Sequence, residues 1–202
     1  TKDFWEYDPS ANSWTQKTDF GGTARSSAVG FSIGNKGYIG TGYDDVYKKD
    51  FWEYDPSADT WMQKADFGGT TRSSAVAFSI DSKGYLGTGY NSNFGANTYY
   101  KDFWEYNPAT NTWTQKADFG GTVRGYAVGF SLGGRGYLGM GNDGSYPYQI
   151  KDFWEYDPSA NIWTQKTDFG GTARRSAVGF SIGTKGYVGM GLNMRDFWQY
   201  DP

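Results

Sequence analysis

The chain has 202 residues with a formal net charge of −3, and about 20% of them are aromatic, which is enough for a substantial core. It contains no cysteine and no histidine, which excludes disulfides, thiolate nucleophiles, imidazole bases and nearly all zinc, copper and haem sites. Because it has neither a run of like charges nor a long apolar stretch, we expect no nucleic-acid binding and no membrane span. Because it lacks cysteine and histidine, we expect no metal and no cofactor.

One heptapeptide, Asp-Phe-Trp-Glu-Tyr-Asp-Pro, recurs along the chain. It starts at Asp3, Asp50 and Asp152, with near copies at Asp102 and Asp196. This spacing is typical of repeats in which each unit is one supersecondary element that stacks on its neighbours. The chain is therefore predicted to be an array.

The unit spanning residues 24–65 begins with two predicted strands. Residues 25–33 carry small and apolar side chains suited to an inner strand that is covered on both faces. A glycine-bounded tight turn follows, and residues 38–42 form the second strand of a hairpin.

Two further strands complete the unit. The third alternates, with Phe51 and Glu53 on one face and Trp52 and Tyr54 on the other. After a proline-containing turn, the more polar residues 60–64 form the fourth and outermost strand. Each repeat is thus predicted to be a four-stranded antiparallel meander.

Such a sheet has an aromatic face that nothing inside the repeat covers. Burial of one tryptophan contributes roughly 4 to 6 kcal/mol as an upper bound, so stacking of neighbouring sheets is strongly favoured. Because each sheet is twisted, stacked sheets fan out around an axis. The fold class predicted is all-β, a β-propeller.

The order of residues within each unit resembles the kelch repeats, of the bacterial secreted type found in the central domain of galactose oxidase. Tyr54-Asp55-Pro56, Trp61 and Arg72 match the turn, the tryptophan and the arginine of that family, although Gly40-Thr41-Gly42 replaces its usual adjacent glycines. The resemblance implies a kelch-type propeller and an extracellular or cell-surface location.

We expect a single domain over residues 1–202, with blade-like repeats at about 24–65, 71–116 and 123–166, and a last blade at 173–202 completed by 1–17. The third-strand motif occurs near both chain ends, so one strand is surplus to four blades. We therefore expect an open or partial ring: a fragment of a larger propeller, or a subunit whose blade edges self-associate.

Only the loops between the second and third strands vary in length. In an antiparallel meander these loops emerge at the same end of the sheet as the connections between blades, so one mouth of the propeller carries all the variability. Its aromatic side chains predict a recognition surface for a protein or a glycan, the alternative being that they only cap blade edges. The candidates are Tyr43, Tyr47, Tyr90, Phe94, Tyr99, Tyr100, Tyr126, Tyr146 and Tyr148.

Four arginines begin the four blades at the same mouth: Arg25, Arg72, Arg124 and Arg174. In related kelch proteins arginines at this position can contact ligands, so the resemblance implies a binding role. Their presence in every blade favours a structural task instead, such as pairing with third-strand glutamates. Those glutamates are Glu6, Glu53, Glu105 and Glu155.

The sequence therefore predicts a non-catalytic binding or scaffold module, with a structural assembly subunit as the alternative. Kelch-like propellers also include a copper radical oxidase and a sialic acid mutarotase, but the oxidase needs a cysteine-linked tyrosine and histidine ligands. A mutarotase-like or glycosidase-like site could use arginine with carboxylates. The glutamates recur symmetrically, however, and only Gly125-Tyr126 and Arg174-Arg175 break the pattern.

Overall fold

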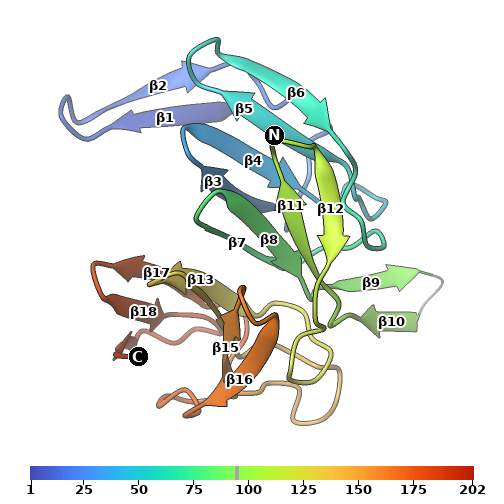
Figure 1. Ribbon diagram of the computed structural model, residues 1–202, viewed down its shortest axis with the longest axis vertical. Coiled ribbons are helices and arrows are strands. Elements are labelled where there is room, and N and C mark those ends of the chain that lie inside the picture. Colours follow the sequence, from blue (N-terminus) through green and yellow to red (C-terminus); the bar gives the residue numbers. More distant parts are fainter. Residues whose placement is uncertain (94–95) are drawn as a thin grey trace.

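The computed structural model describes residues 1–93 and 96–202, and every regular element in this part of the chain is a β-strand. Antiparallel sheets lie side by side as the blades of a four-blade propeller (Figure 1), which confirms the predicted fold class. The described residues form no helix that is long and apolar enough to cross a membrane.

Three blades have four strands in the predicted meander order, the next sheet has three and the N-terminal hairpin has two. The complete blades are β3 (Val29–Ile33), β4 (Lys36–Gly40), β5 (Phe51–Asp55) and β6 (Thr60–Lys64); β7 (Val76–Ile80), β8 (Lys83–Gly87), β11 (Phe103–Asn107) and β12 (Thr112–Gln115); and β13 (Val128–Leu132), β14 (Arg135–Gly139), β15 (Phe153–Asp157) and β16 (Ile162–Lys166). The last sheet consists of β17 (Val178–Ile182), β18 (Lys185–Gly189) and β19 (Phe197–Tyr200), and the hairpin of β1 (Phe4–Asp8) and β2 (Ser13–Lys17).

The longest variable loop contains an additional hairpin that the repeat pattern did not predict. β9 (Tyr90–Asn93) pairs with β10 (Ala96–Tyr99), and Tyr90 lies opposite Tyr99. The Asn91 side chain is buried and its amide donates to the backbone oxygen of Thr71 at 2.9 Å. The loop is thereby held against the start of its own blade rather than extending freely.

Aromatic side chains from both faces of each third strand join neighbouring blades. Phe103 lies edge-on against Tyr156 and Trp163 of the next blade, with ring centroids 4.9 and 5.0 Å away. On the opposite face, Trp104 lies 6.0 Å from Phe67 in the preceding connection. The alternation predicted for this strand is correct. Both faces of the sheet, however, pack against neighbouring segments through aromatic rings, whereas the sequence predicted a single aromatic face.

Glycines in the second strands allow this close stacking. A Cβ atom at Gly136 would lie only 2.5 Å from the Phe78 ring of the preceding blade. A side chain there would force neighbouring sheets apart, since contacts below about 3.5 Å between carbon atoms are repulsive. Gly84 and Gly186 make the same contact with Phe31 and Phe130 of the blades that precede them.

The prediction that residues 1–17 complete the last blade is wrong. The third-strand position of the last sheet is already filled by β19, and β1 is itself a third strand. Phe4 instead packs on Tyr54 and Trp61 of the first complete blade, at 4.8 and 5.1 Å. Among the described residues, the hairpin of β1 and β2 is a separate sheet that lies apart from β17, β18 and β19, so the blades form an open arc (Figure 1).

Both ends of the arc expose apolar side chains whose counterparts inside the arc are buried. Phe180 and Ile182 on β17 are 40% and 63% exposed, whereas Phe78 and Ile80 on β7 are 5% and 4% exposed. At the other end, Trp14 on β2 is 65% exposed. The same residue types are therefore buried or exposed depending on whether a neighbouring blade covers them.

Candidate functional site: the variable mouth

The arginine that begins each blade is part of the buried framework beneath the mouth. In the third blade, Arg124 donates from Nη1 and Nη2 to the two carboxylate oxygens of Asp152, at 2.6 and 2.8 Å. Its other donors reach the backbone oxygens of Met140 and Thr122 and the Thr122 hydroxyl. All the N–H groups of a guanidinium are thus occupied in a fully buried side chain.

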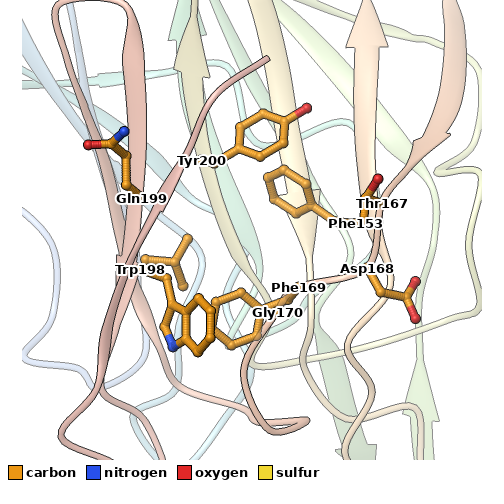
Figure 2. A pocket seen from close by; sticks show the side chains of 9 residues that line it. Phe153, Thr167, Asp168, Phe169, Gly170, Trp198, Gln199 and Tyr200 are labelled. Atoms are coloured by element: carbon orange, nitrogen blue, oxygen red, sulfur yellow. The ribbon is translucent and has the colours of Figure 1, made fainter.

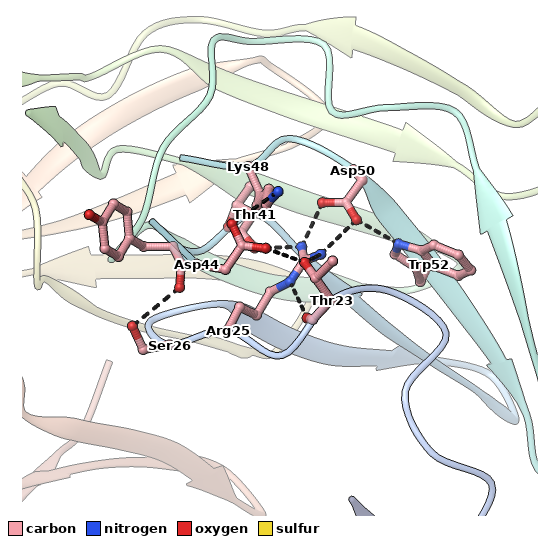
Figure 3. A network of polar contacts seen from close by, with 9 residues as sticks. Thr23, Arg25, Ser26, Thr41, Asp44, Lys48, Asp50 and Trp52 are labelled. Atoms are coloured by element: carbon pink, nitrogen blue, oxygen red, sulfur yellow. Dashed lines mark hydrogen bonds and ion pairs between the residues drawn. The ribbon is translucent and has the colours of Figure 1, made fainter. Parts of the chain in front are cut away.

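Figure 3 shows the same arrangement around Arg25 in the first blade. Arg25 binds both oxygens of Asp50, and the indole nitrogen of Trp52 donates to the same carboxylate at 2.8 Å. Asp44, from the variable loop, accepts the Thr23 hydroxyl hydrogen beside it and pairs with Lys48 at 2.9 Å. The base of the first loop is therefore tied to the arginine network.

The predicted pairing of these arginines with glutamates is wrong. The partners are the aspartates that precede each third strand: Asp50, Asp102, Asp152 and Asp196. Each aspartate lies at the end of the sheet where the arginine enters, whereas the glutamate is three residues further along the strand. Glu105, for example, accepts the Tyr85 hydroxyl at 2.8 Å and pairs with Lys116 at 3.5 Å.

Arg124 keeps the carboxyl group of Asp152 ionised. Burial alone would raise the pKa of Asp152, but the hydrogen bonds and the charge of Arg124 outweigh burial and lower it. The guanidinium also lies over the Phe119 ring, 4.5 Å from its centroid. With their donors engaged inside the blades, Arg25, Arg72, Arg124 and Arg174 are not part of the binding surface that we propose below.

Backbone contacts bring the variable loops and the blade entrances to one mouth, as the meander predicted. Ser73 pairs with Tyr90, and Gly125 pairs with Asn142, each joining a blade entrance to the loop after its second strand. The amide of Gly89 donates to the Arg124 carbonyl of the next blade at 2.7 Å. Neighbouring loops are therefore linked around the mouth.

Five tyrosines form a continuous row across this mouth, which we call the tyrosine row: Tyr43, Tyr47, Tyr90, Tyr99 and Tyr126. Ring centroids are 4.9 Å apart for Tyr43 and Tyr47, and 5.8 Å apart for Tyr47 and Tyr90. Tyr90 then stacks on Tyr99 at 5.7 Å and contacts Tyr126 at 5.2 Å. The row joins side chains from three successive blades.

Arg175 extends the row into the last blade. Its guanidinium lies 5.5 Å from the centre of the Tyr126 ring, and the side chain is half-buried. Burial, and next the Tyr90 hydroxyl, raise the pKa of Tyr126 to about 12. The phenol is therefore neutral at physiological pH and can donate or accept a hydrogen bond.

A polar hollow of about 350 Å³ opens beside the row, between the second and third variable loops and the entrance to the last blade. Gly144 lies against the Tyr99 ring with a φ of +83°, and a Cβ atom there would be 2.9 Å from the ring, so only glycine suits this approach. The lining residues are Asn97, Tyr99, Asn142, Gly144, Tyr148, Gln149 and Arg175.

Three other predicted residues differ in their positions. The Tyr100 ring packs 4.2 Å from the buried Arg72 guanidinium, so it belongs to the arginine network. Tyr146 is 86% exposed and contacts Tyr148 at 5.9 Å without lining the hollow. Phe94 lies outside the described residues.

The predicted site residues omitted the polar part of the hollow. Asn97, Asn142 and Gln149 look like ordinary loop residues in the sequence. Arg175 did carry a signal, because Ser26, Ser73 and Gly125 occupy its position in the other blades. The replacement of a small residue by Arg175 at the entrance of the last blade was therefore the sequence feature that indicated the hollow.

No protein-family description matches the chain. No curated protein matches it either. The structure is similar to a solved propeller titled "Structure of YjhT", with a TM-score of 0.80 at 15% sequence identity, covering 94% of this chain and 66% of that chain. The chain thus spans slightly less than two thirds of that protein's length, and at this identity the likeness establishes that the chain has a β-propeller fold.

Proposed function

We propose that the chain is a non-catalytic, kelch-type binding module whose ligand occupies the variable mouth. The tyrosine row carries this proposal. Five aromatic side chains from two variable loops and one blade entrance form one surface, although the repeat itself does not require them, and Arg175 departs from the repeat at the same place. Rigid tyrosines flanked by adaptable polar groups are typical of recognition surfaces.

The chemistry of the hollow favours a glycan over a protein as the ligand. Tyr148 is 49% exposed and offers a ring face for the C–H groups of a sugar. The Tyr99 hydroxyl, Gln149 and Arg175 offer donors and acceptors for its hydroxyls. Because burial raises the pKa of Tyr99, its phenol is neutral at physiological pH and suited to neutral hydrogen-bond partners.

Catalysis is not favoured by the carboxylates near the mouth. Glycoside hydrolysis requires two carboxyl groups at a defined separation, one of them free to donate a proton. Asp44 is held by Thr23 and Lys48, and Asp143 accepts the backbone amide of Ser145. Thr23 and Lys48 also lower the pKa of Asp44, which makes it a poor acid.

An extracellular location remains part of the proposal and rests on the resemblance to secreted kelch repeats. The Tyr-Asp-Pro turn and the fourth-strand tryptophan, which carry this resemblance, support it because both have structural roles in the blades.

A titration of purified chain with a panel of neutral and acidic oligosaccharides, followed by calorimetry, tests the function. We expect Tyr99→Ala and Arg175→Ser each to weaken binding about ten-fold or more, because each removes a central contact. Tyr7→Ala and Arg135→Ser are matched controls, since Tyr7 lies on the N-terminal hairpin and Arg135 at the turn between β13 and β14. Equal effects of control and mouth variants would contradict the proposal.

A further inference from the structure

The polar hollow at the mouth contains a positive charge that has no counter-charge in the described part of the chain. This charge belongs to Arg175, which is half-buried. Apart from the exposed Arg195, all the other arginines pair with an aspartate: Arg25, Arg72, Arg124, Arg135 and Arg174. A partly desolvated charge without a partner is unfavourable, so a ligand that supplies the opposite charge is stabilised here.

A hollow beside β19 shows a contrasting arrangement. It measures about 240 Å³ and holds the rings of Phe153, Phe169 and Tyr200 (Figure 2). In the complete blades the equivalent rings pack around the fourth-strand tryptophan, as they do around Trp163 in the third blade. That hollow therefore belongs to the packing of the blades, whereas the hollow at the mouth presents a charged group to a ligand.

The Arg175 side chain is directed toward the preceding blade. Gly125 has the same repeat position one blade earlier, and a Cβ atom there would lie 3.3 Å from the Tyr90 ring in the loop of the second blade. The contact between Arg175 and the Tyr126 ring of the third blade has the same direction. The walls of the hollow therefore all come from three consecutive blades of this chain.

Asn142 provides the space for the hollow. In the first two blades a tyrosine follows the second strand, Tyr43 or Tyr90, whereas the third blade has Asn142 at this position. Asn142 is buried, and its Oδ1 accepts the Gly144 amide at 2.7 Å, so the shorter side chain is held within its own loop. The volume of a tyrosine ring is thus left open beside Arg175. Two departures from the repeat, in different blades, therefore create one site.

The hollow is locally positive. No acidic side chain is among the described residues that line it, and the neighbouring Asp143 accepts the Ser145 amide of its own loop at 2.9 Å. Burial, and next Tyr90, raise the pKa of Tyr99, but Arg175 acts in the opposite direction, so its charge reaches the wall of the hollow. In a chain with a net charge of −3, this local field favours an anionic group at the mouth.

We propose that the hollow binds an acidic group of a glycan, a carboxylate or a sulfate ester, with Arg175 as its counter-charge. This inference rests on the proposed glycan-binding function and narrows its ligand class. A guanidinium donates two parallel hydrogen bonds to either group, and the exposed ring of Tyr148 packs on the sugar that carries it.

The charge provides discrimination between acidic and neutral sugars. Hydrogen bonds between a charged donor and a charged acceptor are roughly twice as strong as those between neutral groups. A neutral sugar would cover Arg175 without neutralising it, which costs part of the binding energy. We therefore expect the acidic form of an oligosaccharide to bind about ten-fold or more tightly than its neutral form.

Two matched pairs of probes test this preference by calorimetry. The first pair is tetragalacturonate and its carboxyl-reduced tetramer, and the second is a sulfated galactan tetrasaccharide and its desulfated form. A preference within the first pair identifies a carboxylate as the ligand group, and a preference within the second identifies a sulfate ester. In either case added salt should weaken the acidic probe more than the neutral one.

Substitutions of Arg175 connect the preference to its charge. Arg175→Gln keeps N–H donors but removes the charge, so it should weaken the acidic probe about ten-fold and the neutral probe less than about three-fold. Arg175→Lys should retain the preference. Arg135→Gln is the matched control, because it removes one positive charge at the turn between β13 and β14, and it should leave both affinities unchanged. Thermal unfolding checks that each variant is folded.

Equal binding within both pairs would overturn the inference, and glycan binding at the mouth would still stand if Tyr99→Ala weakened all four probes. A preference that persists in Arg175→Gln would also overturn it, since the charge responsible would lie elsewhere. If neither the four probes nor any other oligosaccharide binds, the inference and the proposed function are both refuted.

Discussion

The buried arginine–aspartate pair is the residue-scale feature that most constrains each blade. Arg124 is fully buried, and its hydrogen bonds reach a loop, the end of the second strand and the start of the third. A buried charge without its partner is strongly unfavourable, so these three segments can pack only in the arrangement that keeps the pair together. The net contribution of the intact pair to the free energy of folding is small by comparison.

Replacing Asp152 by Asn should therefore destabilise the protein. We expect the free energy of unfolding in urea to fall by about 3 kcal/mol, because Arg124 keeps its charge in a buried place and loses its counter-charge. Asp201→Asn is the control, since Asp201 pairs with Lys185 at an exposed position. Similar losses for the two variants would argue against the buried pair as the cause.

The same aspartates determine how stability depends on pH. At Asp50 and Asp152 burial opposes the shift, but the arginine contacts prevail, and at Asp196 the bonds from Arg174 dominate; all three pKa values are lowered. A lowered folded-state pKa contributes stability above about pH 4, and this contribution is lost as pH falls through the folded value.

We therefore expect the free energy of unfolding to be nearly constant from about pH 5 to 8, where no histidine titrates, and to fall steadily below about pH 4. Urea unfolding across this range measures the effect. Asp152→Asn should show a shallower decline than the unsubstituted chain, and an unchanged slope would exclude Asp152 as a contributor.

At the scale of the strand, the fourth-strand tryptophan is buried in one repeat and exposed in another. Trp163 in β16 is 9% exposed, whereas Trp14 in β2, at the same repeat position, is 65% exposed. The local strand is the same in both places. What differs is that a preceding blade covers Trp163, while no described blade covers Trp14.

Alanine substitutions at these two tryptophans should separate local structure from packing. Trp163→Ala should lower the free energy of unfolding by about 3 to 5 kcal/mol through the cavity it leaves. Trp14→Ala should cost less than about 1 kcal/mol, as exposed positions usually do. Thermal and urea unfolding of both variants provide the measurement, and comparable losses would show that the hairpin is covered in solution.

Strand order and turn positions followed from the repeat, because alternation and proline or glycine turns act locally. The β9–β10 hairpin did not, since its strands contain few of the apolar side chains that mark a strand. The partner of Arg124 was also mispredicted: a glutamate and an aspartate three residues apart in a strand look equivalent in sequence, and only the position of the sheet end distinguishes them.

At the scale of the whole molecule, the blades form an open arc with apolar ends. Phe180 and Ile182 lie on one end face, and Tyr7 and Trp14 lie on the other. Exposed apolar patches of this kind are typical of contact surfaces.

We expect this 202-residue chain to self-associate as its concentration rises, through the exposed face of β17. Sedimentation velocity across a hundred-fold concentration range would measure it. Phe180→Glu should reduce association, whereas Val123→Glu, an exposed apolar position away from that face, should not. A chain that stays monomeric throughout would refute this expectation.

The sequence alone determined the repeat, the strand order, the all-β propeller and the end of the sheet where loop variation collects, because each depends on local periodicity and turn chemistry. Only the tertiary structure decided which carboxylate each arginine binds, that five tyrosines and Arg175 form one surface, and where the N-terminal hairpin packs. These depend on contacts between residues from different blades, and no pattern within one repeat contains the geometry that brings them together.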